Sequence, residues 1–248
     1  MDTTPASSAS RRTFLQATGA VAAAGLAARS ASAAPSANER IRIGFIGPGG
    51  QGFGSHVKNL AKLRAAGLPV DLVAVCDVYQ NQAEKVATYI KEQTGSAPKR
   101  YADHRELLAD GSIDAVTVAT PDHWHHRQIV DALRAGKHVY AEKPMTKTVE
   151  EAMDVLGEWK KSGLVMQVGV QSTSLPVWDQ ARGLIDAGKL GKVLGFQTEY
   201  CRNGTTGQWR TYKLEKEMTP QTIDWKRWLG VDEGLAPDMP FEIGRAHV

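Results

Sequence analysis

The chain has 248 residues, 42% of them hydrophobic and 23% charged, and a formal net charge of +3. Residues 1–33 hold three arginines and one aspartate, a net +2, which leaves residues 34–248 with a net charge of about +1. The absence of a clustered basic face argues against a nucleic-acid-binding protein. No apolar run in residues 34–248 is long enough to span a membrane. The length fits one large domain or two small ones.

The first 33 residues have the three parts of an export signal. Residues 10–15 read Ser-Arg-Arg-Thr-Phe-Leu, residues 17–28 form an alanine-rich apolar core, and residues 31–33 read Ala-Ser-Ala, which fits a small-x-small cleavage site. This order predicts a twin-arginine signal peptide. We therefore expect a periplasmic or otherwise exported protein that is recognised by the twin-arginine export machinery. Residues 34–40 follow as a short linker.

From residue 41 the pattern alternates between apolar strands and amphipathic helices. We expect strands at residues 41–46, 70–75, 113–119, 138–141 and 165–169. Strands that alternate with helices predict parallel pairing with right-handed crossovers. Strands that are apolar on both faces predict helices on both sides of the sheet. The predicted fold of residues 41–165 is therefore α/β, a doubly wound parallel sheet.

The helices are expected between these strands, where apolar residues recur at helical spacing. Two of them begin with capping boxes, in which the first side chain pairs with a glutamate three residues on. These are Asp103 with Glu106, and Thr148 with Glu151. The helix that follows Thr148 is expected to bury Trp159.

After residue 165 the pattern changes. A helix is expected over residues 176–187, and alternating apolar and polar side chains over residues 193–201 predict a strand with one apolar face. We expect residues 166–241 to begin a second, α+β domain for substrate binding and oligomerisation, which is truncated in this chain. Residues 242–248 lack periodicity and a helix cap, and they resemble a translated sequencing adapter, so a non-native tail is expected.

The two cysteines, Cys76 and Cys201, make no metal site at this spacing. An exported protein can form a disulfide. However, Cys76 ends the apolar run of residues 72–76, which predicts a buried strand. We therefore expect a buried free thiol at Cys76 in preference to a disulfide.

A glycine motif follows the first predicted strand directly. The six residues from Gly47 to Gly52 read Gly-Pro-Gly-Gly-Gln-Gly, which supplies G-x-G-x-x-G at the start of a helix. Gly47 permits a tight turn, Gly49 lets the backbone approach a pyrophosphate, and Gly52 lets helix and strand pack closely. The helix N-terminus faces the anion with N–H groups and a partial positive charge. This setting predicts a dinucleotide-binding Rossmann domain, with Gly50 and Gln51 also at the cofactor.

Asp77 stands at the end of the second predicted strand, 25 residues after Gly52. A carboxylate there can accept hydrogen bonds from both ribose hydroxyls of an adenosine, and it repels a 2′-phosphate. Residues 78–80 (Val-Tyr-Gln) offer no adjacent cation. The sequence therefore favours NAD over NADP. The structural alternative for Asp77 is a solvated turn residue.

A histidine-rich turn follows the strand before Thr120, and it reads Thr-Pro-Asp-His-Trp-His-His. Ligands of doubly wound sheets bind beyond the carboxyl ends of the strands, so Thr120 and Pro121 are expected at the cofactor. His125 is expected to stack or hydrogen-bond near the nicotinamide, which makes it a candidate catalytic residue. No metal site is predicted, because no carboxylate or cysteine set completes the histidines. His123 and His126 are expected to be solvated at a helix start.

Glu142, Lys143 and Pro144 follow the strand expected at residues 138–141. A lysine held at a strand end beside a cofactor can lose solvation, and it can then polarise a hydroxyl or shuttle its proton during hydride transfer. Pro144 fixes the turn and disfavours helix at Lys143. Lys143 is therefore the main candidate catalytic residue, and both Lys143 and Glu142 are candidate cofactor contacts. The alternative for Lys143 is an ordinary surface charge.

These motifs together resemble the Gfo/Idh/MocA oxidoreductase family: the glycine loop, Asp77, the turn from Thr120 to His125, and the Glu-Lys-Pro turn at Lys143. Residues 187–193 and 224–230 are also similar to that family. The resemblance implies hydride transfer at a sugar, inositol or related polyol carbon, with Lys143 as the catalytic lysine. It also implies further acid–base residues beyond residue 248, and a homo-oligomer when the chain is complete.

Two other functions stay open beside an NAD-dependent oxidoreductase that acts on CH–OH groups. Some exported relatives of the family are glycoside hydrolases that oxidise the sugar transiently and regenerate their NAD, and the Rossmann motifs do not distinguish them. The second is a nucleotide-binding module without catalysis. Because free dinucleotide is scarce outside the cytoplasm, we predict that the cofactor is tightly held through turnover.

Overall fold

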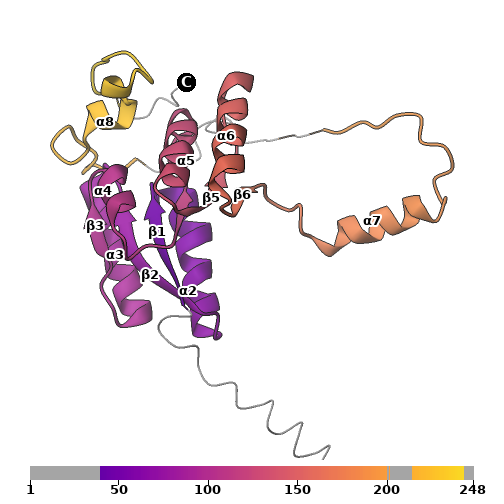
Figure 1. The fold of residues 1–248 in the computed structure, drawn as a ribbon, viewed down its shortest axis with the longest axis horizontal. Coiled ribbons are helices and arrows are strands. Elements are labelled where there is room, and N and C mark those ends of the chain that lie inside the picture. The colour runs from indigo at the N-terminus through magenta and orange to yellow at the C-terminus, as the bar shows by residue number, and fades with distance from the viewer. Residues whose placement is uncertain (1–39, 200, 202–213, 243–248) are drawn as a thin grey trace, which may run out of the picture. The chain divides into compact units, whose positions relative to one another are not determined.

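The computed structural model describes residues 40–199, 201 and 214–242 (Figure 1). All of them belong to one compact unit, which begins at Arg40. The predicted signal peptide of residues 1–33 lies outside the described residues, as does most of the predicted tail. Within the described part of the chain, none of the helices combines the length and apolar character that a membrane span requires.

Six parallel strands form the sheet, in the order β3-β2-β1-β4-β5-β6. Their bounds are β1 Ile41–Ile46, β2 Val70–Cys76, β3 Lys99–Tyr101, β4 Ala115–Val118, β5 His138–Glu142 and β6 Met166–Gly169. The order reverses where β1 pairs with β4, although two strands separate them along the chain. The predicted doubly wound sheet is confirmed. The sequence pattern missed only β3, a three-residue edge strand in which two of the residues are exposed cations.

Helices follow nearly every strand. Their bounds are η2 Gly52–Val57, α2 Lys58–Ala65, α3 Gln80–Thr94, α4 His104–Ala109, η3 Asp122–Trp124, α5 His125–Arg134, α6 Val149–Ser162, α7 Pro176–Asp186, α8 Trp225–Leu229 and η4 Val231–Glu233. The π-helical turn η2 runs directly into α2, and the 3-10 turn η3 runs directly into α5. The helices from η2 to α6 link the strands of the sheet (Figure 1).

Two apolar cores hold the sheet between helices. On one face, Phe45 and Val75 of the sheet pack with Val57, Val86 and Ile90 from the helices after β1 and β2. The second core joins β4 and β5 to α4, α5 and α6. Its helical members are all almost completely buried: Leu107, Leu108, Ile129, Val130, Ala132, Leu133 and Val155. A sheet covered on both faces explains why its strands are apolar throughout.

Both predicted helix starts are correct. The Asp103 carboxylate accepts a hydrogen bond from Arg105 N at 2.8 Å, and the Thr148 hydroxyl accepts one from Glu151 N at 3.2 Å. The prediction that Trp159 is buried is wrong, since it is 39% exposed. Its indole N–H donates to Leu164 O beyond the end of α6, which holds the ring at the helix terminus.

The segment after β6 differs from the sequence expectation. Helix α7 forms where predicted, but none of its residues is buried. Residues 193–199 are not strand, and the residue after them lies outside the described part. Leu194 and Phe196 are 87% and 93% exposed. The predicted strand is therefore wrong for residues 193–199, because a strand is stabilised by a hydrogen-bonding neighbour and none of the described residues pairs with this segment.

Cys76 is buried at the end of β2 as a free thiol, as predicted, and Cys201 is free and exposed. Burial, followed by the negative charge of Asp77, raises the pKa of the Cys76 thiol well above its usual range. Cys76 is therefore an inert core side chain.

Candidate functional site

A cavity of about 860 Å³ opens beyond the carboxyl ends of β1, β2 and β4. Gly47 lines it after β1, Asp77 after β2, and Thr120 after β4. This is the point where the strand order reverses, which is the usual ligand position in doubly wound sheets. The sheet thus brings together three predicted site residues that lie far apart along the chain.

The glycine loop has the geometry that a close backbone approach requires. Gly47 has a φ of +65°, and a Cβ there would lie 2.4 Å from Thr120 Cγ2 and 2.8 Å from Thr120 Cα. A Cβ at Gly52 would lie 3.0 Å from Ala119 Cβ and 3.1 Å from Gly47 O. Only glycine fits at Gly47 without displacing Thr120, and a side chain at Gly52 would require Ala119 or Gly47 to shift by a few tenths of an ångström. Gly49, Gly50 and Gln51 line the cavity at the start of the helix, where the first N–H groups have no intrahelical acceptor.

Asp77 lines the same cavity and is half-buried. Its carboxylate accepts a hydrogen bond from Tyr79 N at 2.9 Å. Desolvation by burial outweighs this bond and raises the pKa of Asp77 to about 7. The carboxylate therefore caps its own turn and also faces the cavity, where it can accept donors from a ligand, so its predicted contact with the ribose stays a prediction.

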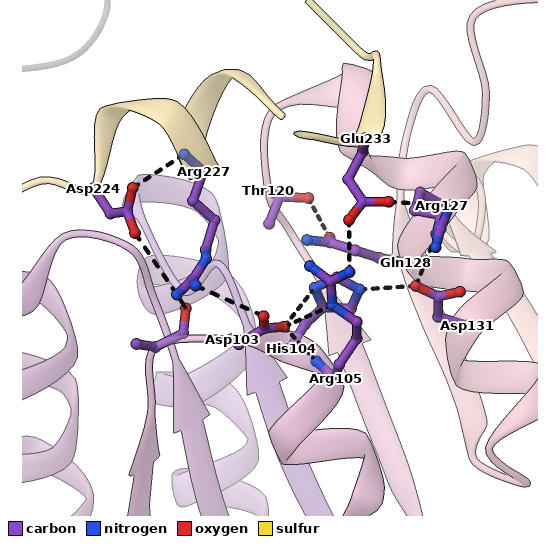
Figure 2. A network of polar contacts seen from close by, with 11 residues as sticks. Asp103, His104, Arg105, Thr120, Arg127, Gln128, Asp131, Asp224, Arg227 and Glu233 are labelled. Atoms are coloured by element: carbon purple, nitrogen blue, oxygen red, sulfur yellow. Dashed lines mark hydrogen bonds and ion pairs between the residues drawn. The ribbon is translucent and has the colours of Figure 1, made fainter. Parts of the chain in front are cut away.

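Some residues of the turn after β4 line the cavity, and others hold the turn in place behind it. Thr120 and Pro121 line the cavity, and the Thr120 hydroxyl donates to Gln128 Oε1 at 2.7 Å (Figure 2). His125 is 2% exposed and lies outside the cavity lining. Its Nδ1 lies 2.6 Å from Pro144 O and its Nε2 2.8 Å from Thr120 O. In this structure His125 therefore joins two loops, and its predicted contact with the nicotinamide stays a prediction.

His123 is buried, so its predicted solvation is wrong. Its Nε2 donates to Trp228 O at 2.9 Å, and its Nδ1 has no hydrogen-bond partner among the described residues. Burial lowers the pKa of His123 and keeps the ring neutral. His126 pairs with Asp154 at 2.8 Å on the surface. Among the described residues, no three metal-ligating side chains gather at one place.

Glu142 is a buried carboxylate that ties the glycine-loop helix to the end of β5. It accepts hydrogen bonds from His56 Nε2 at 2.7 Å, Gln51 Nε2 at 3.4 Å and Lys143 N at 3.3 Å. Lys143 is exposed and precedes Pro144 through a cis peptide bond. Neither Glu142 nor Lys143 lines the cavity, so their predicted contacts with the cofactor stay predictions.

One entire side of the cavity was not predicted from the sequence. Residues 214–242, here called the strap, supply Met218, Ile223, Trp225, Arg227 and Trp228 to its lining. The available signal was local: Asp224 caps the short helix α8 by accepting from Arg227 N, and Trp225 and Trp228 are three residues apart. That spacing places two rings side by side but does not show what they cover.

The strap also changes the charge of the cavity wall. Residues 78–80 contain no cation, yet Arg227 from the strap and Lys85 from α3 both line the cavity, and so do Glu215 and Glu242 from the strap. The preference for NAD predicted from residues 78–80 therefore leaves out charges of both signs that only the fold brings to the cavity.

Residues 41–170 match the GFO_IDH_MocA family model, an oxidoreductase family with an NAD-binding Rossmann fold. The chain belongs to the Gfo/Idh/MocA family. An alpha-N-acetylgalactosaminidase from Shewanella oneidensis is 32% identical over 238 residues, which cover 82% of this chain and 50% of that protein. The chain thus spans about half the length of the curated relatives it matches.

Solved structures agree with this family assignment. An NAD binding oxidoreductase from Klebsiella pneumoniae is 30% identical, with a TM-score of 0.52 over 61% of this chain and 40% of that one. KijD10, a 3-ketoreductase from Actinomadura kijaniata in complex with NADP and TDP-benzene, is 27% identical, with a TM-score of 0.52 over 60% of this chain and 43% of that one. The cavity of this Gfo/Idh/MocA chain fits an NAD(P) dinucleotide, because Gly47, Gly52 and Asp77 have the required geometry.

Proposed function

We propose that the complete protein is an NAD-dependent oxidoreductase that acts on a CH–OH group of a sugar, inositol or related polyol. One observation carries the proposal: the glycine loop, which excludes a side chain at Gly47, and the half-buried Asp77 lie on one cavity. The choice of a sugar or polyol as substrate class rests on the family and on the similarity to an alpha-N-acetylgalactosaminidase.

The proposed roles belong to residues of the cavity and to Lys143 just after β5. A bound nicotinamide cofactor supplies the hydride acceptor or donor. The N–H groups at the start of the helix, around Gly50 and Gln51, face its pyrophosphate, whereas Gly49 N donates to Gly47 O at 2.7 Å. Asp77 accepts hydrogen bonds from the adenosine ribose, and because its charge repels a 2′-phosphate we propose NAD as the preferred form. Lys143 holds or moves a proton at the substrate hydroxyl.

Glu142 and His125 act as positioning residues in this proposal. Glu142 fixes the main chain of Lys143 relative to the glycine-loop helix through its bonds to Lys143 N and His56. His125 joins the Thr120 and Pro144 carbonyls across the two loops that border the site. Both roles depend on rigid placement, since a small shift of a proton donor costs much of its catalytic effect.

Cofactor binding is tested on this chain by titration calorimetry with NAD and with NADP. We expect tight binding of NAD, weaker binding of NADP, and a large loss of NAD affinity in Asp77→Ala. A chain that binds neither dinucleotide contradicts the proposed site.

Turnover is tested on the complete protein, because the chain spans half the length of its relatives. Lys143→Met should remove net hydride transfer while NAD binding in the cavity persists, since Lys143 does not line it. Unchanged turnover means that the role of Lys143 is wrong. Binding without turnover in the wild-type protein supports a nucleotide-binding module without catalysis.

A second candidate is an NAD-dependent glycoside hydrolase that oxidises its sugar transiently. The observation that favours it is the 32% identity to an alpha-N-acetylgalactosaminidase over 82% of this chain. An aryl glycoside assay on the complete protein separates the two functions. Release of the aglycone without net NADH supports the hydrolase, and strict net formation of NADH supports the dehydrogenase.

We also propose export by the twin-arginine route with the cofactor already bound. The proposal rests on the Arg11–Arg12 motif, the alanine-rich core and the cleavage pattern that precede residue 34. A double Arg11→Lys and Arg12→Lys variant should accumulate inside the cytoplasm, while the wild type reaches the periplasm. Periplasmic protein should contain dinucleotide by absorbance and mass. A clean apo-protein with rapid exchange contradicts tight binding.

A further inference from the structure

The strap contacts the Rossmann domain next to its ribose-binding residue. Ile223 forms an antiparallel bridge with Tyr79, Gln80 N donates to Thr222 O at 3.0 Å, and Asp224 N donates to Val78 O at 3.0 Å. These bonds are all within three residues of Asp77. The strap therefore continues the cavity wall outward from the end of β2.

The second contact of the strap lies over the turn after β4. The carbonyl oxygen of Trp228 accepts from both His123 Nε2 and Trp124 Nε1, each at 2.9 Å. Leu229 is buried beside this contact. One carbonyl with two buried donors fixes the position of α8, so the strap crosses the cavity from the end of β2 to the end of β4.

A network of ion pairs holds the far end of the strap (Figure 2). Glu233 is 12% exposed at its side chain, and its two oxygens lie 2.6 Å from Arg105 Nη1 and 3.1 Å from Arg127 Nη1. Nearer the cavity, Arg227 donates to Ala102 O at 3.1 Å. Glu233 thus joins η4 of the strap to α4 and α5 of the Rossmann domain through partly buried charges, which are screened less than exposed ones.

The inner surface of the strap suits an adenine ring. Trp225 and Trp228 stack with their centroids 4.7 Å apart and an angle of 10° between the rings. Both line the cavity with Arg227, on the side where Val78 and Ala102 line it from the domain. Flat aromatic rings and a guanidinium are surfaces on which a nucleobase stacks, and such stacking is worth about 1–3 kcal/mol per base in single-stranded nucleic acid complexes.

We infer that the strap is a clasp that closes the adenosine end of the dinucleotide cavity, with Glu233 as its latch. The inference rests on the proposed dinucleotide site and extends it: the clasp sets how fast the cofactor enters and leaves. Because the strap spans the cavity wall from Val78 to Trp124, adenosine passes in and out when the Glu233 end detaches. The device supplies a physical cause for a cofactor that stays bound through turnover.

The test is stopped-flow kinetics of NADH on the whole chain, with energy transfer from tryptophan to NADH as the signal and excess NAD as the competitor. Glu233→Gln keeps the side-chain shape and removes the charge. We expect its release rate and its association rate to rise together, each by roughly five- to tenfold, because opening limits both. The dissociation constant should change by less than about twofold, since the ratio of the two rates is preserved.

Glu158→Gln is the matched control. Glu158 also joins two cations, Arg134 at 3.1 Å and Lys161 at 2.9 Å, and its side chain is 15% exposed. It lies on α6 and does not line the cavity. Its NADH rates should equal those of the wild type. Trp228→Leu tests the wall itself, and it should weaken NADH binding at least about fivefold through faster release.

The outcomes separate the clasp from the dinucleotide site. If the wild type binds NADH through Asp77 but Glu233→Gln and Glu158→Gln release it at the same rate, the clasp is overturned and the site stands. If release of NADH is faster in Glu233→Gln while association is unchanged, the Glu233 contacts form only after the cofactor has bound. That outcome also overturns the inference, which requires the strap to be closed in the free protein. If the wild type binds no dinucleotide, both proposals are wrong. Circular dichroism of Trp228→Leu confirms that the wall variant is folded, and Trp225→Leu replaces it if it is not.

Discussion

The cavity has two walls of different origin. The inner wall is built from residues that lie just after β1, β2 and β4, namely Gly47, Gly49, Gly50, Gln51, Asp77 and Thr120. The outer wall is the strap, which reaches the cavity from more than a hundred residues further along the chain and is fixed by side-chain contacts to Trp228 and Glu233. In the proposed site, the wall fixed by the sheet holds the pyrophosphate and the ribose, and the wall fixed by separable contacts sets how quickly the dinucleotide exchanges.

The strongest test of the inner wall is Gly47→Val. The left-handed φ and the 2.4 Å approach to Thr120 Cγ2 leave no room for a side chain. We expect a loss of about 3 kcal/mol or more in the free energy of unfolding and no detectable NADH binding. Urea denaturation and calorimetry measure the two effects. Gly157→Ala in α6 is the control, because a Cβ there meets nothing within 4 Å, and it should be neutral or stabilising.

The second largest effect is expected at Asp77, the point where the two walls meet. Asp77→Asn should weaken NAD binding by roughly 10- to 100-fold, because hydrogen bonds to a charged acceptor contribute about 1.5–3 kcal/mol each. NADP should lose much less affinity, since the repulsion of its 2′-phosphate is removed as well. Equal losses for both dinucleotides contradict Asp77 as the discriminating residue.

The pKa of Asp77 predicts how the free energy of unfolding depends on pH. Burial raises the pKa of Asp77 to about 7, above its unfolded value of about 3.9. Its contribution to stability is therefore fully present below about pH 4 and is lost as pH rises through 7. Asp77→Asn should exceed the wild type in free energy of unfolding at pH 8 by about 1–3 kcal/mol, and the difference should shrink toward pH 5.

NAD binding should lower the pKa of Asp77 again. Donors from the ribose favour the charged carboxylate, so NAD binding at pH 7 should release protons, seen as a dependence of the calorimetric enthalpy on the buffer. Asp77→Asn should show no such dependence. A buffer-independent enthalpy in the wild type disagrees with a ribose contact at this carboxylate.

A smaller effect is expected behind the inner wall, at the buried pair of His56 and Glu142. His56→Leu leaves a buried carboxylate with fewer donors, and we expect a loss of about 1–3 kcal/mol in the free energy of unfolding. The exposed pair of His126 and Asp154 is the comparison. His126→Leu should cost less than about 0.5 kcal/mol, because surface ion pairs contribute little. Equal losses mean that burial does not distinguish the pairs.

The smallest effect concerns the outer wall and salt. Ions screen the Glu233 pairs, so raising NaCl from about 0.05 M to about 0.5 M should speed NADH release by roughly twofold. Glu233→Gln should respond less, because its latch has already lost the charge. The same salt response in both proteins means that screening acts on the dinucleotide itself and not on the strap.

The sequence by itself determined the elements and the inner wall. Strand and helix patterns located five of the six strands to within a few residues. The glycine spacing and Asp77 indicated residues that the structure places on one cavity. Neighbouring residues determine these features. Local sequence patterns gave wrong predictions of burial and strand formation where these depend on contacts with residues distant in the chain. Trp159 has an apolar ring but is exposed, His123 is polar but is buried, and residues 193–199 alternate without a partner strand among the described residues.

The tertiary structure alone decided what surrounds the site. His125 is two residues from His123 on a turn that the sequence placed at the cofactor, yet the packing of two loops turns both its nitrogens toward main-chain carbonyls. Glu233 becomes a latch only because α4 and α5 present Arg105 and Arg127 to it. Contacts between residues about a hundred positions apart cannot be predicted from the spacing of apolar residues. That spacing indicates which face of a helix or strand is buried, but not which distant residue covers it.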